Sequence, residues 1–273
     1  MAIKVSEKKE IIRKPEAFQI NGTTFVYPFI GPTRCSEAIT RLRGRMARGS
    51  QVASFLSELF TSKKRNIKPY ADSIRRLLED SVIWLPSKIF EKSCQVKDDK
   101  YKDGFYVEND FDGCMDSNPS EKFYTRLNRL EEDVSAGEVI SGLRISKDGK
   151  VTFVPGKMVR FGKQNPSTLL RNGLITTIYG VEGTKQLASL ARILGVSIRV
   201  HNNPRGYSGM ACLGIGRRSL NFYILPKYVE EDNLSGSVAD KFRQADVTHK
   251  GGYISSTRRI YTRGYAIAVK YTS

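Results

Sequence analysis

The sequence predicts an α+β fold: a helix-rich N-terminal half with a leading β-hairpin, then a strand-rich C-terminal half with an embedded helix pair and terminal antiparallel hairpins. Three observations support this prediction. Asn21-Gly22 separates two strand-like runs, apolar residues recur at helical spacing between residues 36 and 85, and short β-prone runs dominate after residue 139. With 273 residues, 40% of them hydrophobic, the chain is long enough to bury a sizeable core.

Composition divides the chain into four parts. We predict a mobile basic arm over residues 1–14, a helical subdomain with the N-terminal hairpin over 15–96, an acidic connector over 97–117 and a basic α+β domain over 118–273. A single continuous domain over 15–273 is the alternative. The N-terminal arm lacks the apolar centre of a secretory signal, and no run of about 18 uncharged apolar residues occurs. We therefore expect an intracellular protein without a membrane span.

The leading hairpin is predicted from Asn21-Gly22, because both residues accept the positive φ angles of a tight two-residue turn. Pro28 and Pro32 are expected to end the extended structure that follows. Three amphipathic helices are then predicted from the spacing of their apolar residues. They cover residues 36–47, a segment after Gly49, and residues 69–85, with Trp84 in the core.

Seven acidic residues crowd into residues 97–116. The run from Glu108 to Gly113 resembles the opening of a calcium-binding loop, but Pro119 stands where such a loop needs a glutamate. In an extended strand, Asp110 and Asp112 would share one face with Glu108 and could hold magnesium in a nuclease. The other interpretation is an exposed acidic connector that offsets the basic surface, and it predicts no metal and no cofactor.

The remaining elements are predicted from proline and glycine positions. Asn-Pro pairs open helices at residues 118 and 165, and Gly180 and Gly195 are expected to end the two helices of the embedded pair. Turn sequences that tolerate positive φ predict hairpins. The predicted elements are a helix over 118–132, a hairpin of 139–145 with 151–154, helices over 165–178 and 184–194, a strand over 198–201, a hairpin of 210–215 with 220–225, a short helix over 238–244 and a hairpin of 253–261 with 265–271.

The four cysteines, Cys35, Cys94, Cys114 and Cys212, include no closely spaced pair. Zinc ligands usually come in such pairs, so no zinc finger or ribbon is expected. Free thiols in a reducing compartment are predicted, and a bridge between Cys94 and Cys114 is the alternative.

Positive charge is the strongest compositional feature: the formal net charge is +17 and the isoelectric point is near 9.7. Residues 151–228 hold eleven Lys or Arg and one acidic residue, Glu182, although their apolar patterning is that of a folded region. A basic surface on a folded domain predicts a polyanionic partner, with phosphate polyanions as the first candidate. Because basic groups are spread along the chain, backbone binding with weak sequence selectivity is expected.

Two short segments resemble parts of known nucleic-acid readers. Residues 190–197 resemble the first helix and turn of helix-turn-helix proteins, but Asn202-Asn203-Pro204 would cut the recognition helix short. Helix, glycine cap and strand is therefore the predicted order there. Residues 263–266 resemble the start of the nucleic-acid-contacting strand of RNA recognition motifs, and the residues after them depart from that pattern. Both segments still present basic residues, with tyrosines interleaved in the second, which suits phosphate contact and base stacking.

We therefore predict a non-enzymatic nucleic-acid-binding protein of a nucleoprotein or packaging kind, which binds RNA or DNA and can form homo-oligomers. A virion or scaffold assembly protein with a basic face for an acidic partner is the first alternative, and a magnesium-dependent nuclease using Asp110 and Asp112 is the second. His201 has no nearby carboxylate or nucleophile that would make it a catalytic base. The predicted nucleic-acid contacts are Arg41, Arg45, Arg48, Lys63, Lys64, Arg65, Arg160, Lys163, Arg199, Arg205, Tyr207, Arg217, Arg218, Arg258, Arg259, Arg263 and Tyr265.

Overall fold

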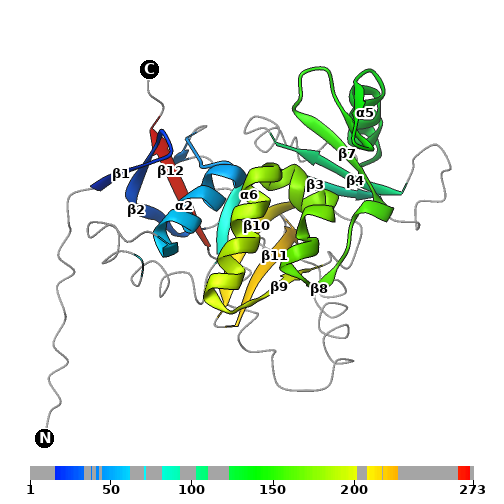
Figure 1. Cartoon of the computed structure of the whole chain (residues 1–273). Helices are drawn as coiled ribbons and strands as arrows, with labels where there is room; N and C mark the ends of the chain where they lie inside the picture. The colour runs from blue at the N-terminus through cyan, green and yellow to red at the C-terminus, as the bar shows by residue number, and fades with distance from the viewer. Residues whose placement is uncertain are drawn as a thin grey trace, which may run out of the picture.

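The computed structural model describes residues 16–33, 38, 41–42, 45–61, 71, 82–92, 103–109, 123–201, 208–216, 218–226 and 264–270 (Figure 1). These residues form a mixed α+β fold, as predicted. Within them, nine strands make one large sheet and three more make a smaller sheet beside it. The predicted arm over 1–14, the helix over 238–244 and the strand over 253–261 lie outside the described residues.

The smaller sheet brings together strands from the two ends of the chain. β1 (Glu16–Ile20) and β2 (Thr23–Thr33) form an antiparallel hairpin. Asn21 and Gly22 between them have φ angles of 48° and 78°, which confirms the predicted turn. β12 (Gly264–Lys270) pairs antiparallel with β2 and meets the large sheet at one parallel residue pair.

Three prolines lie inside strands, each where the pairing between strands shifts register. Pro28 and Pro32 fall in the two register shifts between β2 and β12. Pro86, in β3 (Val82–Lys92), falls in the shift between that strand and β10 (Ser208–Gly216). A bulge leaves residues without a ladder hydrogen bond, so the missing proline N–H costs little there. β2 therefore continues through both prolines that were expected to end it.

The large sheet is built from strands in the middle and C-terminal parts of the chain. Besides β3 and β10, it contains β4 (Gly104–Glu108), β5 (Glu138–Ile140), β6 (Leu143–Ile145), β7 (Val151–Pro155), β8 (Gly162–Gln164), β9 (Ser197–Val200) and β11 (Ser219–Pro226). Their order across the sheet is β5-β6-β7-β4-β3-β10-β11-β9-β8. Neighbours are antiparallel except β9 and β11, which are parallel. The predicted strand before Asn202 and the hairpin of β10 with β11 are confirmed.

Two predicted elements are corrected by the structure. The sequence predicts a helix that reaches residue 85, but β3 starts at Val82 and is buried on both faces. A continuous apolar run fits helical spacing as well as a strand covered on both sides, so periodicity alone could not separate them. The single strand predicted over 139–145 is a hairpin, because Ser141 and Gly142 turn the chain with φ angles of 51° and 84°.

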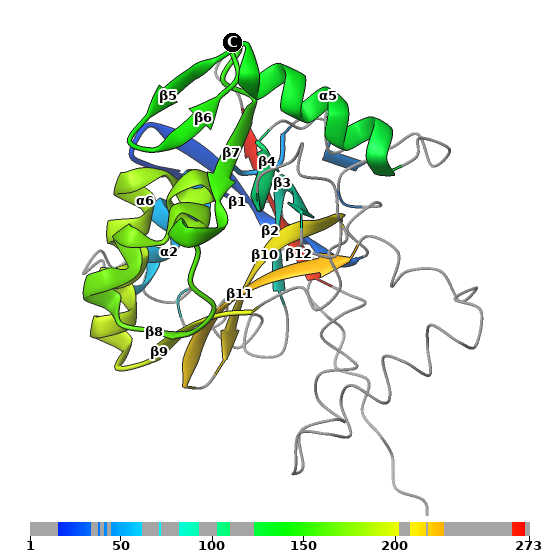
Figure 2. The ribbon, with the colours of Figure 1, turned by 90° about the vertical axis from the view of Figure 1, so that its right-hand side faces the viewer.

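Two helices cover one face of the large sheet (Figure 2). These are α2 (Gly49–Thr61) and α6 (Gly173–Leu194), and two short 3-10 helices, η1 (Gly156–Met158) and η2 (Pro166–Arg171), precede α6. The helices pack closely because Gly183 of α6 lies against the backbone of α2, where a Cβ would stand 3.2 Å from the Ser50 Cα.

Glycines end the two halves of α6 as predicted. Gly180 has φ 70° and ψ 166°, so the helical backbone breaks there, and Gly195 caps the C-terminus with φ 63°. Both backbone conformations are ones that residues with a Cβ rarely adopt. The predicted helix over 165–178 differs in its first part, since Pro166–Arg171 is the 3-10 helix η2.

The opposite face of the sheet is covered in two places. At the β4–β7 end, α5 (Phe123–Ser135) buries Leu127, Leu130 and Val134 against sheet residues that include Tyr106 and Phe153. In the middle, Leu42 and Met46 cover Trp84 and Cys212, which confirms that Trp84 is a core residue. Cys212 is a buried thiol that is not in a disulfide, as predicted, and Cys35, Cys94 and Cys114 lie outside the described residues.

The predicted acidic connector contains a core strand. All five residues of β4 are buried, and Glu108 at its end forms an ion pair with Arg126 of α5. The expectation of an exposed segment is therefore wrong for residues 104–108, because their apolar side chains complete the centre of the sheet. The division of the chain at residues 97–117 stays a prediction, although β3 and β10, from its two sides, pair directly.

Candidate nucleic-acid interface

The face of the large sheet opposite α2 and α6 carries polar side chains where it runs over β8, β9 and β11. Lys163 of β8 lies directly opposite Arg199 of β9, and Arg199 lies opposite Asn221 of β11. Ile198 and Val200 on either side of Arg199 belong to the core under α6, so Arg199 points to the other face. Lys163 and Arg199 are both exposed. The strand register thus sets two cations side by side on the same sheet face as Trp84.

No acidic side chain in the described part of the chain forms an ion pair with Lys163, Arg199 or Arg218. Opposed residues on neighbouring strands have Cβ atoms about 5 Å apart, and a pair of like charges in this arrangement is destabilising. The pair therefore costs the fold some stability and leaves a concentrated positive potential. An anion placed between the two side chains would relieve the repulsion.

Two aromatic rings lie next to this pair. His201, which follows β9, stacks on Tyr223 of β11 with ring centroids 4.3 Å apart and planes at 19°. The His201 Nε2–H donates to Asn221 Oδ1 at 3.1 Å, and Asn221 Nδ2 donates to Ser219 Oγ at 2.9 Å. The carboxamide fixes the imidazole plane and leaves Nδ1 as the acceptor nitrogen. Tyr223 packs in turn against the Trp84 and Cys212 cluster, so the stack is anchored in the core.

His201 is held in its neutral form. Burial lowers its pKa below the ordinary value of 6.5, and the nearby charge of Arg199 lowers it further, while the hydrogen bond to Asn221 acts in the opposite direction. At neutral pH the ring is therefore an uncharged aromatic surface beside two cations.

Backbone contacts hold the strands that carry these side chains. Asn172 Nδ2 donates to the Arg160 carbonyl oxygen at 2.7 Å, and Gln164 Nε2 donates to the same oxygen at 3.2 Å. The backbone N–H of Ser197 donates to the Arg218 carbonyl oxygen at 3.0 Å, which ties the exposed turn residue before β11 to the start of β9. We call Lys163, Arg199, His201, Asn221 and Tyr223 the basic strand patch.

The structure sets two of the predicted contacts, Lys163 and Arg199, side by side, and places Arg218 in the turn before β11 and Arg160 in the loop just before β8. Arg41, Arg45 and Arg48 are exposed on the segment that covers the neighbouring part of the same face. The other predicted contacts lie outside the described residues, or have a side chain that does: Lys63, Lys64, Arg65, Arg205, Tyr207, Arg217, Arg258, Arg259, Arg263 and Tyr265.

Sequence reasoning did not assign a binding role to His201, Asn221 or Tyr223. A signal for them exists in the chain, because Ser197, Arg199 and His201 alternate with apolar residues, as do Ser219, Asn221 and Tyr223. Alternation shows that each strand has a polar face. It does not show that β9 and β11 are neighbours, and the patch depends on that pairing.

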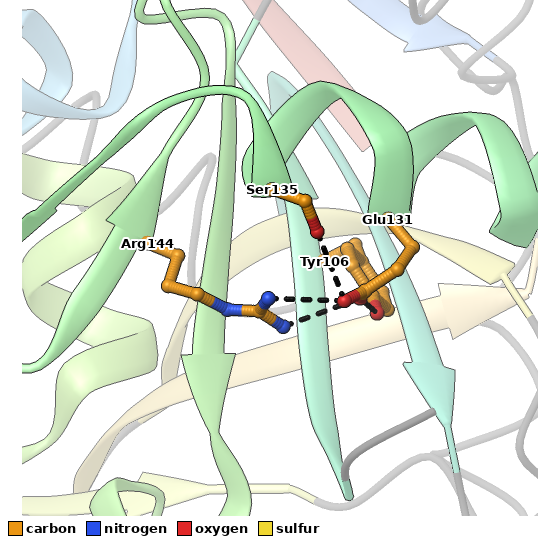
Figure 3. A network of polar contacts seen from close by, with 4 residues as sticks. All are labelled: Tyr106, Glu131, Ser135 and Arg144. Atoms are coloured by element: carbon orange, nitrogen blue, oxygen red, sulfur yellow. Dashed lines mark hydrogen bonds and ion pairs between the residues drawn. The ribbon is translucent and has the colours of Figure 1, made fainter. Parts of the chain in front are cut away.

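A second polar network joins α5 to the sheet (Figure 3). The Glu131 carboxylate accepts hydrogen bonds from the Tyr106 hydroxyl, from both terminal nitrogens of Arg144 at 3.0 and 3.2 Å, and from Ser135 Oγ at 3.3 Å. Burial by itself would raise the Glu131 pKa, but the hydrogen bonds from Tyr106 and Arg144 and the charge of Arg144 hold it below its ordinary value. Arg144 also lies over the Phe153 ring. This network fastens a helix to strands and leaves the carboxylate fully occupied.

Among the described residues, no three His, Cys, Asp or Glu side chains gather as a metal site would require. Glu108 forms an ion pair with Arg126 of α5. Asp110 and Asp112 lie outside the described residues. No helix in the described ranges has the length and apolar character needed to cross a membrane.

No protein-family model and no curated protein matches the chain. A likeness exists to a solved structure described as "Accommodation of massive sequence variation in Nanoarchaeota by the C-type lectin fold", with a TM-score of 0.40 and 10% sequence identity over 92% of this chain and 99% of that chain. A likeness of this strength carries no argument about function, so the function is inferred from the side chains themselves.

Proposed function

We propose that this protein binds nucleic acid by its phosphate backbone at the basic strand patch. One observation carries the proposal: Lys163 and Arg199 face each other across β8 and β9, and no described acidic residue neutralises them. Arg and Lys are the side chains that most often contact phosphate, and a guanidinium can hold two phosphate oxygens at once. Phosphate contacts carry no sequence information, so weak sequence selectivity is expected.

Rigidity of the patch supports the same proposal. Lys163 and Arg199 stand on strands, Arg160 lies in a loop held by Asn172 and Gln164, and Asn221 is fixed by Ser219. Side chains on a rigid scaffold lose less freedom on binding than those on a mobile loop. Arg41, Arg45 and Arg48 extend the positive surface over the neighbouring part of the face.

The test is a fluorescence titration with single-stranded RNA, single-stranded DNA and duplex DNA at several salt concentrations. We expect affinity to fall with salt, and the variant Lys163→Ala/Arg199→Ala to reduce the slope of log affinity against log salt by roughly 1.4 for a single strand or roughly 1.8 for duplex, as expected for two lost phosphate contacts. Arg192→Ala is the matched control, since Arg192 is an exposed cation on α6, across the sheet.

Affinity that does not change with salt, or an equal loss in the double variant and in Arg192→Ala, would contradict the proposal. Titration with polyglutamate distinguishes nucleic-acid binding from the alternative of an assembly protein with an acidic partner. If the protein binds this acidic polypeptide as tightly as nucleic acid of equal charge, the result would favour an assembly protein that recognises negative charge alone.

A further inference from the structure

We infer that the basic strand patch takes single-stranded nucleic acid, with one unpaired base stacked on the His201 ring while Arg199 and Lys163 hold the adjoining phosphates. This inference rests on the proposed function and names the substrate class of that site. It follows from the arrangement of the two rings, from the partial exposure of His201 and from the place of the rings relative to the cations.

The rings of His201 and Tyr223 are stacked, so the protein itself covers one face of the imidazole. Tyr223 covers one face of the imidazole at 4.3 Å, and it is itself packed against the Trp84 and Cys212 cluster. His201 follows β9, which lies between β11 and the edge strand β8, and its side chain is partly exposed. Aromatic side chains bind unpaired bases by this kind of face-to-face contact.

The imidazole is on the same sheet face as the two cations. His201 is partly exposed, whereas Val200 before it is buried in the core beneath α6. Because side chains alternate along a strand, the His201 ring lies on the face that carries Arg199 and Lys163. A ligand that contacts the two cations can therefore also reach the ring.

The spacing between ring and cations fits one strand of nucleic acid. His201 and Arg199 are two residues apart on the same side of the chain, which is about 6.6 Å along a strand. A single strand that crosses the patch can therefore place a phosphate at Arg199 and the attached base on His201. Bases inside a duplex are covered on both faces by their neighbours and cannot make this contact without being flipped out.

Three probes of equal length separate stacking from charge: a single-stranded DNA, the same strand with abasic sites, and the duplex. We expect wild-type protein to bind the first at least about five-fold more tightly than the second at equal salt, because stacking is the contact that abasic sites remove. His201→Ala should lose this difference, whereas His201→Phe, which keeps a ring, should retain it. Circular dichroism and the thermal midpoint confirm that both variants fold.

The salt slope is the second readout. His201→Ala is expected to leave it unchanged, since no phosphate contact is removed. Equal wild-type affinity for the normal and abasic strands, or the same loss in His201→Ala on both strands, would overturn the inference while the salt dependence still supported backbone binding. Salt-independent binding, or no binding, on all three probes would instead overturn the proposed function.

Discussion

Gly49, the first residue of α2, lies against the backbone of Ile178 in α6 so closely that a Cβ would stand 2.3 Å from the Ile178 carbonyl oxygen. Gly49→Ala is therefore expected to push the two helices apart and to lower the free energy of unfolding by about 1–3 kcal/mol, as overpacking does. Urea unfolding measures this loss. Ser50→Ala, an exposed neighbour in the same turn, is the control, and equal stability of the two variants would contradict the contact.

Gly180 provides a contrasting case, because a Cβ there would meet no atom within 4 Å. Its backbone conformation, φ 70° and ψ 166°, is one that essentially only glycine adopts. We expect Gly180→Ala to cost about 1–3 kcal/mol through backbone strain alone. Thermal unfolding beside Ser189→Ala, an exposed position later in α6, tests this. Unchanged stability would mean that α6 runs through residue 180 without a break.

Glu131 gives the protein an acid-dependent stability. Its folded-state pKa is below the unfolded value, since the hydrogen bonds from Tyr106 and Arg144 outweigh the effect of burial. The stabilisation is therefore fully present above the unfolded pKa and is lost as pH falls through the folded pKa. Glu131→Gln should show a flatter decline of the urea midpoint below about pH 5 than wild type or the exposed control Glu132→Gln. Parallel curves for all three proteins would contradict this.

His201 makes folding stability depend on pH in a higher pH range than Glu131 does. Burial and the charge of Arg199 lower its folded-state pKa, so the unfolded chain takes up the proton first as pH falls. Stability is present above about pH 6.5 and declines as pH drops through the window between the unfolded and folded pKa values. His201→Phe cannot titrate and should lack this part of the decline. The same substitution at His249, the other histidine in the sequence, shows which of the two histidines causes the pH dependence. If stability still declines with falling pH in His201→Phe as it does in wild type, His201 is not the cause.

Local backbone preferences account for the elements that the sequence predicted well. Asn21-Gly22, Gly180 and Gly195 adopt positive φ angles because few other residues tolerate them, and that property can be read without knowing what lies nearby. β3 is a strand where the apolar spacing predicts the end of a helix, because its apolar residues face a core on both sides of the sheet. Pro28, Pro32 and Pro86 stay within strands because distant partner strands supply register shifts.

For the site, the order of amino acids specifies the surplus of positive charge and the polar face of each strand. It did not determine which strands are neighbours. Only the tertiary structure set Lys163 opposite Arg199 and placed Tyr223 under His201, because the pairing of β8, β9 and β11 depends on burial of their other face beneath α6. Register depends on contacts between residues far apart in the chain. It is this register that brings the separate basic and aromatic residues together on one surface.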